Sequence, residues 1–248
     1  MLSAVPELSI VVPVHREGEA ARPVIEKLVG CVDVPHEIVV VYDESDDPTL
    51  PVLEDLHRRR PEIRAVQNRL GRGPALALRA AFASVTGDAV VVTMADASDD
   101  PHDIPRMLAR LREGYDLVAG SRYMAGGQQL GGPRLKSRLS RFAGRSLQAL
   151  VGLPTADATS AFKMYRKSML DALTIESRHG FEISLEITVK ALLGGYRITE
   201  VPTVWRDRVA GRSKFRLVRW LPHYLRWYGL ALGRGLFRGR HRALRTAL

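Results

Sequence analysis

Four short runs of apolar, mostly β-branched residues punctuate the first hundred positions of the chain. They read LSIVVPV (8–14), HEIVVVYD (36–43), IRAVQN (63–68) and DAVVVTMAD (88–96). Continuous apolar runs of this length are typical of strands that are covered on both faces. Helical patterns lie between them, and this strand–helix–strand alternation predicts right-handed βαβ units and a mainly parallel sheet.

The pattern after residue 100 is less regular. It predicts a helix at 101–114, a strand at 116–123, a basic amphipathic helix at 131–152, a short strand at 159–167 and a glycine-terminated helix at 181–195. The segment ITEVPTVWRDR (198–208) reads as one further strand, and its Pro202 indicates a position at the edge of the sheet.

Composition narrows the class of protein. A chain of 248 residues that is 46% hydrophobic fits one folded domain, with or without an appendage, and not a disordered protein. The single cysteine, Cys31, excludes an internal disulfide framework and a cysteine-based zinc site, and it fits a reducing compartment. No basic segment precedes the first apolar run, so we interpret that run as a strand and not as a signal peptide.

The net charge of +10 is concentrated in the last 41 residues. Eleven of the 37 Lys and Arg residues and no acid lie between Arg208 and Leu248, so the first 207 residues balance 26 basic against 27 acidic side chains. Such a cationic tail could bind nucleic acid, an anionic membrane or a phosphate-bearing substrate.

Polar residues gather where the predicted strands end, which is where ligands bind in open α/β sheets. Asp43 and Asp96 end the second and fourth strands and should point into one crevice. Carboxylates there can bind a hard cation that neutralises a diphosphate, or accept hydrogen bonds from a base or ribose. The segment PVHREGEAA after the first strand matches neither GxGxxG nor GxxxxGK[ST], which argues against ordinary dinucleotide binding and P-loop chemistry.

The tetrapeptide SDDP follows two of these strands. An Asp before a Pro is a common helix start, so we assign Asp47 and Asp100 to helix capping. Asp46 and Asp99 are left open between capping and function, and Asp43 and Asp96 are the stronger functional candidates.

Together these segments resemble family 2 glycosyltransferases of the GT-A fold, in the dolichol-phosphate mannosyltransferase-like branch. The resemblance runs from about Leu8 to Phe215 and rests on segments in this order: IVVPVHRE, EIVVVYDESDDPT, NRLGRGPALALRAAF, VVTMADASDDPHDIP, LVAGSRY, SRLSRFAG, DATSAFKMYRK, GFEISLEITVKA and ITEVPTVWRDRVAGRSKF. It implies an α/β fold with a Rossmann-like, mixed but mainly parallel sheet flanked by helices. It also implies a catalytic domain over residues 1–215 and a basic, aromatic, amphipathic helix over 216–248.

The resemblance also implies roles for individual residues. The donor nucleotide would be bound by Pro13, His15, Glu17, Asp43, Ser45, Gly71 and Ser213. The catalytic set would be Asp96, Arg122, Asp157, Arg208 and Lys214. A divalent cation, Mg²⁺ or Mn²⁺, would be held by Asp96 together with Ser98 and Asp99.

The chain departs from the family pattern at four of these positions. Met94 replaces the first acid of the Asp-Ala-Asp segment, and Ser98 replaces a glutamine. Tyr42 replaces the first acid of an Asp-Asp pair, and His15 replaces a tyrosine. The metal site therefore loses one carboxylate and one amide, for which Asp99 or a water could compensate.

The acceptor decides what further chemistry is needed. A lipid phosphate is already anionic, so it needs positive charge to hold it but no general base. The candidate cationic residues are Arg122, Lys136, Arg138, Arg141, Arg208 and Lys214. Of these, we interpret Lys136 and Arg138 as part of a solvated helix face. A sugar hydroxyl would need a base, with Asp157, Glu182 and Glu186 as candidates. Asp157 and Ser160 are expected to shape the acceptor side of the pocket.

The tail combines aromatic rings with arginines. Its longest apolar stretch, between Arg226 and Arg234, is far shorter than the roughly 20 residues of a membrane-spanning helix. Aromatic and arginine side chains together favour the membrane interface. The alternatives are a helix packed on the body with a disordered basic end, or a nucleic-acid-binding tail, although nothing in the body resembles a nucleic-acid reader.

We therefore predict an inverting, metal-assisted transfer of a hexose from a GDP- or UDP-sugar to a polyprenyl phosphate. The reaction would take place on the cytoplasmic face of a membrane, with a membrane-protein partner subunit possible and no nucleic-acid partner. The alternatives are transfer to a saccharide hydroxyl, or a catalytically degenerate binding or scaffold subunit.

Overall fold

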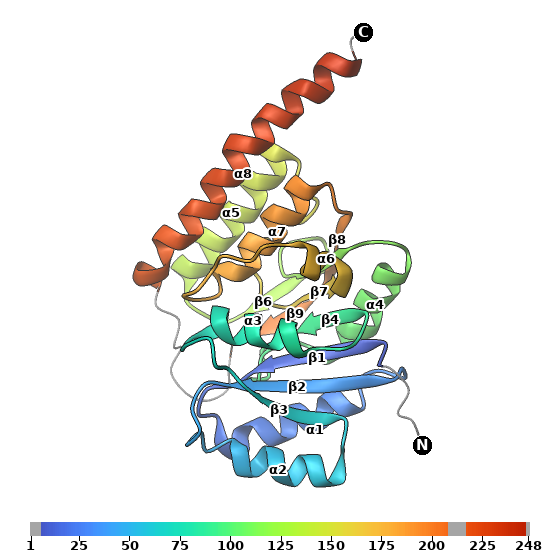
Figure 1. The fold of residues 1–248 in the computed structure, drawn as a ribbon. Coiled ribbons are helices and arrows are strands. Elements are labelled where there is room, and N and C mark those ends of the chain that lie inside the picture. Colours follow the sequence, from blue (N-terminus) through green and yellow to red (C-terminus); the bar gives the residue numbers. More distant parts are fainter. Residues whose placement is uncertain (1–5, 208–216, 247–248) are drawn as a thin grey trace.

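The computed structural model describes residues 6–207 and 217–246, and in the second range it describes side chains from 220 to 234. Its body is a seven-stranded sheet in the order β3-β2-β1-β4-β7-β5-β8, with helices on both faces (Figure 1). The strands are β1 Leu8–Pro13, β2 His36–Tyr42, β3 Ile63–Gln67, β4 Ala89–Val92, β5 Leu117–Ser121, β7 Lys163–Arg166 and β8 Ile198–Pro202. A second, two-stranded sheet pairs β6 Gln128–Leu130 with β9 Val204–Arg206.

Eight α-helices occur in the described residues. They are α1 Arg22–Val29, α2 Leu50–Arg59, α3 Pro74–Ser84, α4 Ile104–Arg112, α5 Arg134–Val151, α6 Lys167–Ala172, α7 Glu182–Gly194 and α8 Leu217–Thr246. Short 3₁₀ segments, Gly18–Ala21 and Pro101–Asp103, lead into α1 and α4. The first four predicted strands and the helices between them are confirmed.

The sheet is buried on both faces because successive side chains of each strand point to opposite sides. Val11 and Val39 belong to one core with α3, α5, α7 and α8. Ile10 and Ile38 belong to the other core, with α1, α2 and α4. This arrangement explains why β1, β2 and β4 read as continuous apolar runs and not as alternating ones. The edge strand β3 is only partly buried, so the expectation that it is covered on both faces is wrong.

Strand β7 runs against the direction of its neighbours. Met164 pairs with Val91 of β4 and with Val118 of β5, and both pairings are antiparallel, whereas β1, β2, β3 and β4 are parallel. The segment just before β7 therefore reaches the edge of the sheet at which β4 and β5 end. The mixed, mainly parallel sheet that the sequence predicts is confirmed.

The single strand predicted at 198–208 is wrong in one respect. Its first half is β8, an edge strand of the main sheet as Pro202 indicated, but its second half is β9, which belongs to the two-stranded sheet. The chain changes sheets at Thr203, whose backbone N–H donates to the carbonyl of Ser121 at 3.1 Å.

Helix α8 lies beside α5 and α7 in its first half, and its second half extends beyond the body (Figure 1). Trp227 is 2% exposed, and Ala231 is fully buried. A helix is thus present where the sequence predicts a basic, aromatic tail; the division of the chain at residue 215 and the contact of the tail with a membrane remain predictions.

Candidate active site

A cavity of about 1250 Å³ opens at the carboxyl ends of the parallel strands. Most of the predicted site residues in the described part of the chain line it: Pro13, His15, Glu17, Asp43, Asp96, Ser98, Asp99 and Arg122. Asp43 and Asp96 therefore do face one crevice. Three other described residues, Ser45, Gly71 and Asp157, lie outside the lining, and Arg208, Ser213 and Lys214 lie outside the described residues.

Asp43 ties the end of β2 to the loop that precedes α3. Its Oδ1 accepts a hydrogen bond from Asn68 Nδ2 at 2.7 Å, and its Oδ2 accepts one from the backbone N–H of Gly73 at 2.9 Å. Asn68 Nδ2 also donates to the carbonyl of Gly71, so Gly71 helps to shape this turn from outside the cavity. Contact of Asp43 with a base or ribose remains a prediction.

The capping role assigned to Asp100 is confirmed, whereas the one assigned to Asp47 is wrong, because the N-cap of α2 is Thr49. Asp100 is the N-cap of the 3₁₀ segment before α4 and accepts a hydrogen bond from the backbone N–H of His102 at 3.1 Å. Asp47 accepts hydrogen bonds from the backbone N–H of Thr49 and of Arg16, both at 2.8 Å. It thereby organises the start of α2 and fixes the loop after β1.

Asp96 and Asp99 form an acidic pair beyond the end of β4. Asp99 Oδ2 accepts hydrogen bonds from the backbone N–H of Met94 at 3.1 Å and from Thr93 Oγ1 at 3.3 Å. Asp96 Oδ1 accepts one from the backbone N–H of Ser98 at 3.1 Å. Burial, and then the charge of Asp96, raise the pKa of Asp99 to about 7.

This pair fits a divalent cation only in part. No cluster of three or more His, Cys, Asp or Glu side chains suited to a metal ion occurs in the described ranges 6–207 and 220–234. Met94 lines the cavity where a further carboxylate would complete such a cluster. Burial and a neighbouring carboxylate disfavour the ionised form of Asp99, and a cation would nevertheless stabilise that form, provided that a diphosphate and water supplied the remaining oxygen ligands.

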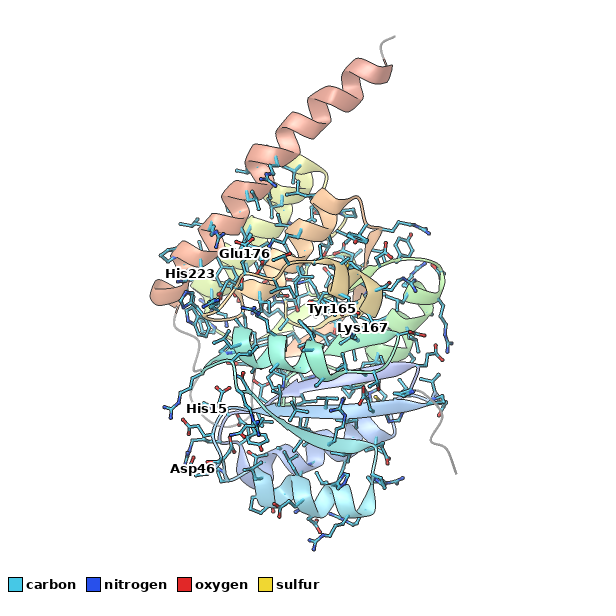
Figure 2. The ribbon with its side chains drawn as sticks, viewed as in Figure 1. His15, Asp46, Tyr165, Lys167, Glu176 and His223 are labelled. Atoms are coloured by element: carbon cyan, nitrogen blue, oxygen red, sulfur yellow. The ribbon has the colours of Figure 1, made fainter. Side chains whose placement is uncertain are left out.

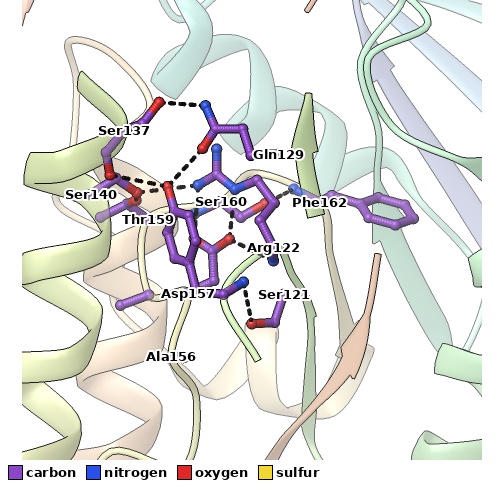
Figure 3. A network of polar contacts seen from close by, with 12 residues as sticks. Ser121, Arg122, Gln129, Ser137, Ser140, Ala156, Asp157, Thr159, Ser160 and Phe162 are labelled. Atoms are coloured by element: carbon purple, nitrogen blue, oxygen red, sulfur yellow. Dashed lines mark hydrogen bonds and ion pairs between the residues drawn. The ribbon is translucent and has the colours of Figure 1, made fainter. Parts of the chain in front are cut away.

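Arg122 lines the cavity from the end of β5 and is held from behind by Asp157 (Figure 3). Arg122 Nε donates to Asp157 Oδ2 at 2.7 Å, and Nη2 donates to Asp157 Oδ1 at 2.8 Å and to Ser140 Oγ at 3.2 Å. Burial alone would raise the pKa of Asp157, but the charges of Arg122 and Lys163 keep it below its usual range. Asp157 is fully buried, so its expected place in the pocket lining is wrong: it reaches the cavity only through Arg122.

A lysine that the sequence analysis did not single out lies beneath this ion pair. Lys163 in β7 is fully buried, and its Nζ donates to the carbonyls of Ala158 and Ser160, at 2.9 and 2.5 Å, and to Ser184 Oγ at 2.9 Å. It thereby fixes the loop that places Ser160 in the cavity wall. The lone charged residue of the apolar segment SAFKMY was the signal that could have pointed to it.

Glu182 and Glu186 are not available as bases at the cavity. Both are buried on α7, and neither lines the cavity. Glu182 accepts hydrogen bonds from two backbone N–H groups of the preceding loop, at 3.0 and 2.6 Å, and Glu186 accepts two more at 2.6 and 2.8 Å. Glu186 also pairs with Lys190 Nζ at 2.7 Å. Their oxygens organise a loop instead.

The remaining walls contain charged and aromatic residues that the sequence analysis did not assign. Of the residues labelled on this side of the molecule in Figure 2, His15 lines the cavity, whereas Glu176 and His223 above it and Asp46 below it do not. The unassigned lining residues include Arg72, Arg178, His179, Trp205, Trp220 and Tyr224. Lys136 also lines the cavity, so its interpretation as part of a solvated helix face is wrong, whereas Arg138 is exposed outside the lining.

One wall of the cavity is apolar and continues onto the surface. Leu139 and Phe142 of α5 and Leu221 and Leu225 of α8 line it, and Phe142 and Leu225 are 67% and 56% exposed. Leu135, one turn before Leu139 on α5, is 64% exposed. We call these five residues the apolar wall. None of the described helices has the length and apolar character needed to cross a bilayer.

Comparison with known proteins identifies the family to which this chain is similar. Residues 9–174 match the family described as glycosyl transferase family 2. An undecaprenyl-phosphate 4-deoxy-4-formamido-L-arabinose transferase of Enterobacter sp. (strain 638) is 30% identical over 223 residues, which cover 88% of this chain. A dolichol-phosphate mannosyltransferase of Pyrococcus furiosus is 27% identical over 235 residues, which cover 90% of this chain. The chain spans 65% of the length of each of these two relatives.

Solved structures agree on the fold. Glucosyl-3-phosphoglycerate synthase of Mycobacterium tuberculosis, in complex with Mn²⁺, UDP and glucosyl-3-phosphoglycerate, superposes with a TM-score of 0.66 at 21% identity. The match covers 93% of this chain and 80% of that one. The same enzyme with Mg²⁺ and UDP gives a TM-score of 0.63 at 22% identity, over 93% and 79% of the two chains. The fold is therefore that of the GT-A glycosyltransferases.

Proposed function

The chain belongs to glycosyl transferase family 2, and from this premise we propose that it transfers a hexose from a GDP- or UDP-sugar to a polyprenyl phosphate, with inversion at the anomeric carbon. The observation that carries the proposal is that one cavity contains the acidic pair Asp96 and Asp99, the arginine Arg122 and the apolar wall. The acidic pair suits a cation that binds the donor diphosphate, Arg122 suits the acceptor phosphate, and the apolar wall suits the lipid chain. Relatives named for undecaprenyl-phosphate and dolichol-phosphate transfer support the choice of acceptor.

The donor half of the proposal rests on charge. The departing nucleoside diphosphate gains negative charge as the sugar leaves, and a divalent cation supplies the electrostatic stabilisation of that charge. Asp96 and Asp99 would hold the cation, with Ser98 nearby, while Pro13, His15, Glu17 and Asp43 lie where the nucleotide would bind. The synthase that shares the fold was crystallised with Mn²⁺ or Mg²⁺ and UDP, which supports a divalent cation in general.

The acceptor half of the proposal rests on the fact that a phosphate acceptor needs no general base. A phosphate monoester is already anionic at neutral pH, so it can attack the anomeric carbon once it is held in place. Arg122, fixed by Asp157, offers a guanidinium that matches the geometry of phosphate oxygens. Asp157, Glu182 and Glu186, the bases predicted for a hydroxyl acceptor, are buried behind the cavity wall. This supports a phosphate acceptor over a hydroxyl.

The apolar wall supports a lipid as the carrier of that phosphate. It leads from the cavity to the surface along α5 and α8, where an isoprenoid chain would bury exposed apolar side chains. Exposed arginines flank it on α5, including Arg138, Arg141 and Arg145, and would attract anionic headgroups. We propose peripheral binding of this face to the cytoplasmic side of a membrane, with a membrane-protein partner compatible with it.

One experiment separates the candidate functions. The protein is incubated with radiolabelled GDP- or UDP-hexose, Mn²⁺ or Mg²⁺ and a polyprenyl phosphate in detergent. Label that partitions into organic solvent and is released by mild acid supports the proposal. Label found only in an added glycan identifies a hydroxyl-acceptor transferase. The absence of both turnover and metal-dependent nucleotide binding identifies a degenerate binding subunit, the alternative that Met94 keeps open.

A further inference from the structure

The loop at residues 176–181, between α6 and α7, is held in place by the helix that follows it. Glu186 accepts hydrogen bonds from the backbone N–H groups of Glu176 and Ser177, and Glu182 accepts those of His179 and Gly180. Buried carboxylates are costly unless they are hydrogen-bonded, so these four bonds stabilise both the acids and one conformation of the loop. We call this segment the 176–181 loop.

Helix α8 holds the same loop from the other side. Trp227 Nε1 donates to Ser177 Oγ at 3.1 Å, and the indole is almost completely buried. The rings of His179 and His223 are stacked, with centroids 3.9 Å apart and an angle of 24° between the planes. The loop is thus clamped between α7 and α8, although the three segments are separate in the sequence.

Two glycines allow the close approach of the neighbouring segments. Gly73, before α3, has φ of +116°, and a Cβ there would lie 3.0 Å from the carbonyl oxygen of His179. A Cβ on Gly180 would overlap the indole of Trp220. Because the N–H of Gly73 is bound to Asp43, the loop lies against the side of the cavity that we assign to the donor.

The clamped loop presents Arg178 to the cavity. Arg178 is exposed and belongs to the cavity lining. Two other lining arginines have carboxylate partners: Arg122 binds Asp157, and Arg72 lies 3.3 Å from Glu44. Within residues 6–207 and 220–234 no carboxylate forms an ion pair with Arg178, so its charge is not neutralised by the protein there. A cation presented in this way by an ordered loop favours an anionic ligand.

We propose that Arg178 is a further phosphate-binding residue of this site. The inference rests on the proposed function, which places a diphosphate and a phosphate monoester in the same cavity. A guanidinium binds either group through two parallel hydrogen bonds. The phosphate belongs to the donor diphosphate or to the acceptor lipid, and the two sources are separated by experiment.

The test compares Arg178→Ala and Arg178→Lys with Arg58→Ala, which removes a 76% exposed arginine of α2 outside the cavity lining. Calorimetry measures Kd for UDP, GDP and inorganic pyrophosphate in the presence of Mn²⁺, and the transfer assay measures KM for polyprenyl phosphate. We expect Arg178→Ala to raise one of these constants about tenfold or more, Arg178→Lys to raise it less, and Arg58→Ala to leave it unchanged. A change in Kd identifies the donor phosphate, and a change in KM alone identifies the acceptor phosphate.

The proposal is overturned if Arg178→Ala leaves every constant within about twofold of the wild-type value, or if Arg58→Ala has the same effect. The role of the clamp is tested by Gly180→Ala, which should displace Trp220, against Gly229→Ala, whose added methyl group meets nothing within 4 Å. Gly180→Ala should reproduce the change in the same constant, and an unchanged constant would exclude positioning by α8. If wild-type protein transfers no sugar to polyprenyl phosphate, the proposed function fails, whereas Arg178-dependent binding of pyrophosphate or UDP would still support the assignment of Arg178.

Discussion

Arg122 and Asp157 form a bidentate ion pair in which the carboxylate is fully buried and the guanidinium reaches the cavity. Asp157 Oδ2 also accepts a hydrogen bond from the backbone N–H of Arg122 at 3.1 Å, so the acid fixes both the side chain and the main chain of its partner. An arginine held in this way keeps its orientation when a phosphate approaches, because its rotamer is already selected.

Replacement of Asp157 by Asn should therefore reduce both stability and activity. The change leaves the buried guanidinium of Arg122 without its counter-charge, and breaking a buried pair in this way typically costs about 3–5 kcal/mol. Urea denaturation measures the loss. Asp55→Asn is the control, because Asp55 pairs with Arg22 and Arg59 at the surface and should cost less than about 1 kcal/mol. Equal losses for the two variants would contradict the importance of the buried pair.

Lys163 should make stability depend on pH in the alkaline range. Burial lowers its pKa to about 7, with Asp157 acting against that shift, whereas an unfolded lysine titrates near ~10.4. Between these values the unfolded chain binds one more proton than the folded protein, so the free energy of unfolding should rise with pH. The free energy of unfolding of the wild type minus that of Lys163→Met should increase from pH 7 to pH 10. A constant difference would mean that the three acceptors around Nζ keep the lysine charged.

Asp96→Asn should weaken metal-dependent binding of the donor nucleotide. The change removes one of the two charges of the acidic pair with little change in shape, and we expect Kd for UDP or GDP with Mn²⁺ to rise about tenfold or more, which is about 1.4 kcal/mol. Asp100→Asn is the matched control, because asparagine caps a helix as well as aspartate does. Calorimetry with and without EDTA measures the effect. Unchanged Mn²⁺-dependent binding by Asp96→Asn would exclude our metal site.

Met94→Asp should have the opposite effect on metal binding. It adds a third carboxylate beside Asp96 and Asp99, and we expect roughly tenfold tighter Mn²⁺ binding together with lower stability in the absence of metal, since three like charges repel one another. Met94→Asn, which adds an oxygen without a charge, should show a smaller gain. Competition with a fluorescent Mn²⁺ chelator and thermal unfolding provide the two measurements. Unaltered Mn²⁺ affinity in Met94→Asp would place the cation elsewhere.

The apolar wall should contribute to membrane binding and not to folding. Phe142→Ser and Leu225→Ser remove exposed side chains, so the melting temperature should change little, whereas flotation with anionic vesicles should fall several-fold. Burial of one such side chain is worth about 1.5–3 kcal/mol. Leu70→Ser is the control, since Leu70 is 55% exposed but lies outside the wall. Equal vesicle binding by all three variants would show that this face does not bind the membrane.

The parts of the fold that follow from local pattern could be predicted from the sequence. Strands β1, β2 and β4 are covered on both faces, and this burial is visible in the sequence as uninterrupted apolar runs, whereas β3 lies at the edge of the sheet and is only partly buried. Because parallel strands end at one edge, the meeting of Asp43 and Asp96 followed from the same pattern. The capping role of Asp100 was also local, since its carboxylate accepts a hydrogen bond from a backbone N–H two residues away, whereas Asp47 binds the N–H of Thr49 without being the N-cap of α2.

The parts that depend on distant pairings could not be predicted. Glu182 and Glu186 lie four residues apart in the chain, but nothing in that spacing shows that the loop before the helix folds back onto their oxygens. The same applies to Arg178, an ordinary charged loop residue until α8 clamps its neighbours. Asp157 was expected in the pocket lining from the family resemblance, but that resemblance did not place it behind Arg122.

The reversed direction of β7 has a consequence for how the two substrates are recognised. The acidic pair follows the end of β4, whereas the segment with Asp157 and Ser160 enters the same edge just before β7 begins. Neighbouring strands thus bring two stretches, about sixty residues apart in the chain, to the same edge of the sheet. Under the proposed function, exchange of one stretch should alter the preference for one substrate while strand pairing keeps the backbone of the other stretch in place.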